Sequence, residues 1–121
     1  MSAQELTQVI SQIAMDKKAK DVIVFDFEGQ SSVCDLQLIC SSDSGRQGLT
    51  ICEAIEDKIK QLYDMRPLYI EGRSEGEWIY LDYGAVLVHI LQKEARDYYR
   101  IEEIWKDVKT TNVQPLVTLP N

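Results

Sequence analysis

The chain has 121 residues, of which 45% are hydrophobic and 27% charged, values that are ordinary for a single soluble globular domain. Its 13 Lys and Arg against 20 Asp and Glu give a formal net charge of -7, which disfavours direct DNA binding and favours a basic protein as partner. The uncharged apolar runs are too short to span a bilayer, and the amino-terminal stretch lacks the features of a leader peptide. We therefore expect a cytoplasmic protein that does not associate with membranes.

The first part of the sequence predicts a helix followed by two strands. The helix runs from Ser2 to about Lys18, because Ser2 with Glu5 is typical of a capping box and apolar residues follow at helical spacing. Residues 21–27 and 31–42 are rich in β-branched and aromatic side chains. A Glu-Gly-Gln turn signal lies between these two segments, and it predicts that they pair as a hairpin.

A long second helix is predicted after this hairpin. Ser44 with Gln47 provides a cap at its start, and Pro67 prevents it from continuing. Its inward face is expected to carry Cys52, Ile55, Ile59 and Leu62, and its opposite face is charged.

Three more strands are predicted at 67–72, 77–83 and 85–91. Glycines bound the first turn, and Gly84 separates the last two strands so narrowly that an antiparallel hairpin is expected. One or two short helices follow, in which the side chains expected to face inward are Tyr98, Ile101, Ile104 and Trp105.

This order of elements predicts one α+β domain, because strands on both sides of a central helix form a mixed sheet more readily than a regular βαβ array. About five strands are expected, with the helices packed against the sheet. The domain is expected to cover residues 1–109, and residues 110–121 are expected to form an extended or flexible tail.

The three cysteines indicate neither a disulfide framework nor a zinc site. Cys34, Cys40 and Cys52 are odd in number, form no CxxC motif and have a single His in the chain to complete a metal set. We expect buried, reduced thiols, and no metal or other cofactor.

The stretch from 77 to 90 carries the strongest functional signal. Strand alternation places Trp78, Tyr80 and Asp82 on one face of their strand. An exposed Trp beside Tyr and Asp has the composition of a binding hot spot, although a Trp that only covers a helix is the alternative. His89 lies among apolar neighbours, where a hydrogen-bonded structural imidazole is the commoner role.

The same region resembles the ribosomal silencing factor family, also called the Iojap or RsfS family. The residues that carry the resemblance are Glu71, Gly72, Trp78, Asp82, Tyr83, Gly84, Val88, His89, Arg96, Tyr99, Glu102, Trp105 and Asp107. With a further likeness upstream, it covers about Leu6 to Asp107. The chain departs from the family at Ala85, where an acidic residue is usual, at Leu91, where Phe is frequent, and at Leu36-Gln37, where an aromatic pair is usual.

The resemblance implies a factor that binds the large ribosomal subunit through ribosomal protein fourteen, where the small subunit must dock. Joining of the subunits is then blocked by occlusion rather than by enzymatic chemistry, and translation is damped when nutrients are short. The residues expected to bind the partner are Trp78, Tyr80, Asp82, Tyr83, Arg96 and Glu102, whereas His89 and Trp105 are expected to be mostly structural. A homodimer of the free protein is left open.

Two other functions are alternatives. The family's sheet resembles that of nucleotidyltransferases, and Asp26, Glu28 and Asp82 are conceivable magnesium ligands. The spacing disfavours this hypothesis, because such enzymes need two acidic residues on the strand that follows the phosphate-binding helix, and that strand offers only Glu71. A non-ribosomal interaction module is the other alternative.

Overall fold

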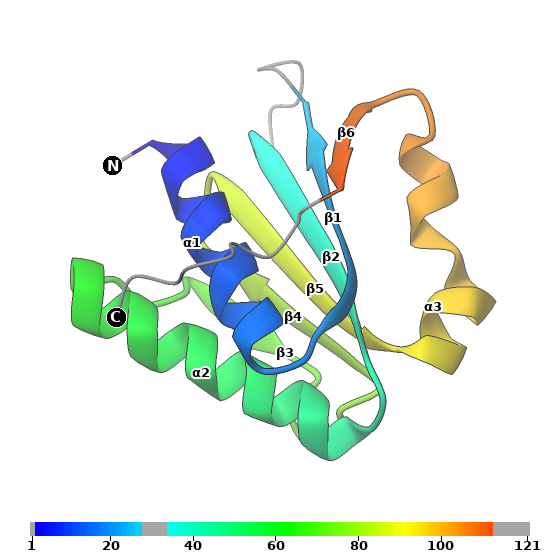
Figure 1. Cartoon of the computed structure of the whole chain (residues 1–121), viewed down its shortest axis with the longest axis horizontal. Helices are drawn as coiled ribbons and strands as arrows, with labels where there is room; N and C mark the ends of the chain where they lie inside the picture. The colour runs from blue at the N-terminus through cyan, green and yellow to red at the C-terminus, as the bar shows by residue number, and fades with distance from the viewer. Residues whose placement is uncertain (1, 28–33, 113–121) are drawn as a thin grey trace.

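The computed structural model of the protein describes residues 2–27 and 34–112. Its elements are α1 (Ala3–Asp16), β1 (Lys20–Asp26), β2 (Leu36–Ser42), α2 (Gly45–Tyr63), β3 (Tyr69–Glu71), β4 (Trp78–Asp82), β5 (Val86–Gln92), α3 (Lys93–Tyr99), the 3-10 helix η1 (Ile101–Trp105) and β6 (Lys109–Asn112). The strands form one mixed sheet in the order β3-β4-β5-β2-β1-β6 (Figure 1). The predicted α+β fold is confirmed, and the sheet has one strand more than expected.

The sixth strand lies where the sequence predicts a tail. β6 pairs antiparallel with β1, so the expected boundary between residues 109 and 110 falls inside a strand. The segment Lys-Thr-Thr-Asn contains no apolar residue and so shows no apolar alternation, and this is why the sequence did not reveal the strand. The remainder of the predicted tail, 113–121, lies outside the described residues.

The two long helices begin at the predicted caps. The Ser2 hydroxyl accepts a hydrogen bond from the Glu5 amide at 3.1 Å, and the Ser44 hydroxyl accepts one from the Gln47 amide at 3.0 Å. Each cap satisfies an amide that the first helical turn leaves without an internal partner. The end of α2 departs from the prediction, because Leu62 is 50% exposed and not part of the buried face.

The sheet separates two hydrophobic clusters. On one side, α1 and α2 pack against alternate residues of the strands, including Leu38, Val88 and Ile90. On the other side, α3 and η1 cover a smaller cluster that contains Phe25, Ile39, Leu91, Ala95 and Ile101. Both faces of the central strands β2 and β5 are therefore buried.

Two residues of the α3–η1 segment were placed wrongly by periodicity. Tyr98 is 80% exposed and Ile104 is 73% exposed, although both were expected to face inward. The chain breaks its helical path at Arg100, which has the left-handed φ of 48°, and this changes the face on which Ile104 falls. Tyr98 precedes the break, in a helix of which only Ala95 and Arg96 are buried. Ile101 is buried as expected, and Trp105 packs against the smaller cluster.

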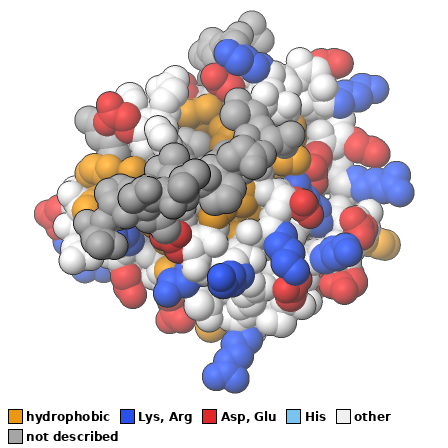
Figure 2. All heavy atoms as spheres, in the orientation of Figure 1, with side chains coloured by type: hydrophobic (Ala, Val, Ile, Leu, Met, Phe, Trp, Pro, Cys, Tyr) orange, Lys and Arg blue, Asp and Glu red, His pale blue; other side chains and the backbone are white. Residues whose placement is uncertain are grey.

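The remaining expectations of the fold concern thiols and membranes. All three cysteines lie in the described part of the chain, are buried and form no disulfide, and burial raises the pKa of Cys40 and of Cys52 to about 12, so buried thiols are confirmed. Among the described residues, no helix combines the length and the apolar character that crossing a membrane requires. On the face viewed in Figure 1, acidic and basic side chains are interspersed (Figure 2).

Candidate partner-binding surface

Strand β4 divides its side chains between the core and a partly exposed face. Ile79 and Leu81 are fully buried on the side of α2, whereas Trp78, Tyr80 and Asp82 are partly exposed on the other side. This is the alternation that the sequence predicts. α3 and η1 lie on the same side of the sheet as these three residues, and β4 stays partly open to solvent there.

Six aromatic rings lie in series across this open face, and we call them the aromatic ladder. In order from β3 to α3 they are Tyr69, Tyr80, His89, Trp78, Tyr99 and Tyr98. Neighbouring ring centroids are 5.0 to 6.4 Å apart, within the range in which aromatic pairs attract each other. Tyr69, Tyr99 and Tyr98 are 52%, 47% and 80% exposed, so the ladder offers aromatic area to solvent at both ends.

A chain of hydrogen bonds fixes the indole of Trp78. Its Nε1–H donates to Nδ1 of His89 at 3.1 Å, which places the imidazole proton on Nε2. That Nε2–H donates in turn to Oε1 of Gln37 at 2.9 Å. Burial lowers the pKa of His89 to about 4, and the ring is therefore neutral at pH 7. The buried, hydrogen-bonded imidazole expected at His89 is confirmed.

Gln37 supports this surface from the interior, and sequence reasoning missed it. It is 8% exposed on β2, a strand whose residues are all buried, and it belongs to the dipeptide that departs from the aromatic pair usual in the family. The signal for Gln37 was a polar amide between two leucines of a strand, because an amide buried there needs a hydrogen-bond partner.

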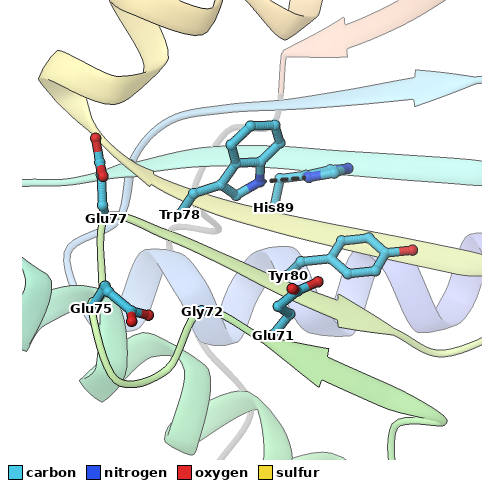
Figure 3. A pocket seen from close by; sticks show the side chains of 7 residues that line it. All are labelled: Glu71, Gly72, Glu75, Glu77, Trp78, Tyr80 and His89. Carbon is cyan, nitrogen blue, oxygen red and sulfur yellow. Dashed lines mark hydrogen bonds between the residues drawn. The ribbon is translucent and has the colours of Figure 1, made fainter.

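A pocket beside the ladder combines aromatic rings with acidic side chains (Figure 3). It has a volume of about 420 Å³, and its lining residues are Glu71, Gly72, Glu75, Glu77, Trp78, Tyr80 and His89. Figure 3 shows the carboxylates of Glu71 and Glu75 pointing into the space between the turn and the rings. We call this the acidic pocket.

The turn between β3 and β4 forms the acidic side of the pocket, and glycines fix its path. Gly72 and Gly76 have φ values of +87° and +72°, which L side chains rarely adopt. A Cβ on Gly72 would lie 1.9 Å from the Trp78 carbonyl oxygen, and one on Gly76 would lie 2.7 Å from the Cα of Gly45. The turn is therefore pressed against both β4 and the start of α2, and this holds the glutamates near the rings.

Several residues expected on the partner surface are held inside the protein. Tyr83 is 7% exposed and belongs to the cluster under α1 and α2, because strand alternation places it on the same buried face as Ile79 and Leu81. Arg96 is 9% exposed and pairs with Glu102, whose side chain is 30% exposed.

Asp82, by contrast, is partly exposed, and its Oδ1 accepts a hydrogen bond from the Gly84 amide at 2.7 Å, which shapes the β4–β5 turn. Trp78 and Tyr80 thus form the centre of the surface.

The proposed magnesium ligands do not form a recognisable centre in the part of the chain that the structure describes. Glu28 lies outside the described residues, and within them no three His, Cys, Asp or Glu side chains are grouped so as to hold a metal ion. The likeness to nucleotidyltransferases stays a prediction.

Comparisons with known proteins agree with the resemblance seen in the sequence. A family model described as "Ribosomal silencing factor during starvation" matches residues 1–120. A relative named ribosomal silencing factor RsfS, from Halalkalibacterium halodurans, is 32% identical over 118 residues, covering 98% of this chain and 100% of that protein. Another of that name, from Bacillus subtilis, is 33% identical over 107 residues, covering 88% and 90%. A crystal structure of a Chromobacterium violaceum protein matches with a TM-score of 0.83 and 28% identity, covering 99% of this chain and 95% of that one.

Proposed function

The chain belongs to the ribosomal silencing factor family, and from that premise we propose that it represses translation by binding the large ribosomal subunit through ribosomal protein fourteen. Bound there, it occludes the face on which the small subunit docks. The mechanism requires no chemical step, so we propose a cytoplasmic binding factor rather than an enzyme.

The aromatic ladder beside the acidic pocket is the observation that carries this proposal. Tyr and Trp are enriched at binding hot spots because they bury a large area at a small cost in side-chain entropy. Carboxylates beside such rings favour a basic partner, and ribosomal proteins are typically basic because they bind RNA. A protein interface of ordinary size, about 800 Å² on each side, is sufficient for occlusion.

Replacing Trp78 by Ala tests the proposal. We expect binding to large subunits to weaken by at least about 2 kcal/mol, which is roughly thirtyfold, and the block of subunit joining to weaken in parallel. Trp78 is only partly buried, so the variant should still unfold cooperatively, with a melting temperature lowered by a few degrees. Co-sedimentation with purified large subunits, sucrose-gradient analysis of subunit joining and thermal melting measure these three effects.

Leu62→Ala is the matched control, because Leu62 is an exposed apolar residue on α2, away from the ladder. It should bind and block joining like the wild type. If Trp78→Ala also binds and blocks like the wild type, the ladder is not the docking surface and the proposal fails.

A further inference from the structure

We infer that the acidic pocket receives one Lys or Arg side chain of the protein on which the aromatic ladder docks. The inference rests on the proposed function, because it assigns the chemistry of one partner group at the same surface. It is carried by three features of the pocket, namely its unpaired charge, its aromatic walls and its rigidity.

The charge of the pocket is not neutralised by the residues that the structure describes. Glu71 accepts a hydrogen bond from the Tyr69 hydroxyl at 3.1 Å, and Glu75 accepts one from the Ser74 hydroxyl at 2.8 Å. Within the described ranges, no ion pair reaches Glu71, Glu75 or Glu77. The nearest cation in sequence, Arg73, is 3.5 Å from Glu56 on α2 and so faces away from the pocket.

The aromatic walls suit a cation better than an anion, and the carboxylates beside them favour a cation over an apolar group. A ring carries negative potential on its face, so an ammonium or guanidinium group gains attraction within about 6 Å of the centroid. Tyr80 and Trp78 line the pocket together with the glutamates, and both kinds of wall attract positive charge. The volume of about 420 Å³ accommodates one long side chain and the water it retains.

The walls are also held in place before any partner arrives. Trp78 is fixed by its hydrogen bond to His89, and Tyr80 lies directly opposite His89 in the β4–β5 pair. The glutamate turn is held by the close approach of Gly76 to Gly45. Preorganised walls lower the entropy that binding must overcome.

The decisive variant replaces Glu71 and Glu75 together by Gln, which removes two charges and keeps acceptors for the Tyr69 and Ser74 hydroxyls. We expect affinity for large subunits to fall about tenfold, mainly through faster dissociation, with a smaller dependence of affinity on salt. The control is Glu53→Gln with Asp57→Asn, an equal charge change on exposed residues of α2, across the sheet from the pocket. It should change affinity less than twofold.

A second measurement avoids the ribosome and tests the pocket itself. Ethylguanidinium is titrated into the wild type while the indole N–H resonances of Trp78 and Trp105 are followed by NMR. We expect a saturable shift at Trp78 that disappears in the Glu71→Gln, Glu75→Gln variant and persists in the α2 control. Thermal melting confirms that both double variants are folded.

The outcomes separate this inference from the proposed function. If Trp78→Ala loses subunit binding while the two double variants bind equally well, the docking surface stands and the cation pocket is overturned. If the wild type itself does not bind large subunits, the proposed function fails, and the inference about the partner fails with it. A tenfold loss confined to the pocket variant, together with a Trp78 shift that requires both glutamates, supports the inference.

Discussion

At the scale of single residues, the surface depends on one imidazole that must stay neutral. His89 accepts a hydrogen bond from Trp78 on one ring nitrogen and donates to Gln37 from the other. Protonation would place a donor on both nitrogens, and the Trp78 N–H would then face another N–H. The orientation of the partly exposed indole is therefore coupled to the protonation state of a residue that is 8% exposed.

This coupling predicts a pH dependence of stability. Burial lowers the pKa of His89 from 6.5 to about 4 in the folded protein, so the unfolded chain binds more protons between these pH values. Stability should accordingly be unaffected by His89 well above pH 6.5 and should fall as the pH drops from 6.5 towards 4. Between pH 7 and pH 5 the loss attributable to His89 is about 2 kcal/mol.

His89→Gln tests this prediction, because Gln keeps a donor and an acceptor but does not titrate. Since His89 is the single histidine of the chain, the difference between wild type and variant isolates its contribution. Urea unfolding at pH 7 and pH 5 should show the smaller loss for the variant. Equal losses in the two proteins would mean that His89 is accessible to protons in the folded state.

At the scale of elements, Arg96 attaches the α3–η1 segment to the sheet. Its guanidinium donates to both carboxylate oxygens of Glu102 at 2.5 and 3.1 Å, to the Asp21 carbonyl at 2.7 Å and to the Ser41 hydroxyl at 2.8 Å. One side chain thereby joins β1, β2, α3 and η1. The segment it holds carries Tyr98 and Tyr99, so Arg96 supports the ladder from the interior.

Replacing Arg96 by Lys should destabilise the protein by about 2 to 4 kcal/mol, because a single ammonium cannot reach the partners that the planar guanidinium bridges. The matched control is Arg100→Lys, whose ion pair with Glu103 is 3.5 Å long and exposed at both ends. That change should cost less than about 1 kcal/mol. Chemical denaturation measures both, and a similar small cost for the two variants would show that the Arg96 network adds little.

At the scale of the whole molecule, two hairpins are joined into one sheet by a parallel pair. β1 with β2 and β4 with β5 are antiparallel hairpins, and β2 lies parallel to β5 with seven residues in register. That central pair brings Gln37 next to the strand that carries His89. β6 then covers the edge of β1, which would otherwise leave backbone groups without partners.

Truncation measures what this last strand contributes. A chain that ends at residue 108 should be less stable than one that ends at residue 112 by about 1 to 3 kcal/mol, because the four residue pairs between β1 and β6 are lost. Thermal melting of the two chains compares them directly. Equal melting temperatures would favour the domain boundary at 109 that the sequence predicts.

The sequence by itself determined the features that depend on neighbours along the chain. Helix caps at Ser2 and Ser44, the alternation of β4 and the turn at Gly84 follow from local hydrogen bonding and from the two periodicities of the backbone. The motif around Trp78 likewise identified the family, which the matching family model confirms.

Only the tertiary structure decided the features that depend on residues distant in the chain. Gln37 and His89 are 52 positions apart, and Arg96 reaches Asp21 across 75 positions, so no local pattern predicts either contact. The same reason explains why Arg96 is buried while Tyr98 is exposed, against the expectation for each. Periodicity states which residues share a face, whereas the packing of other elements decides whether that face is covered.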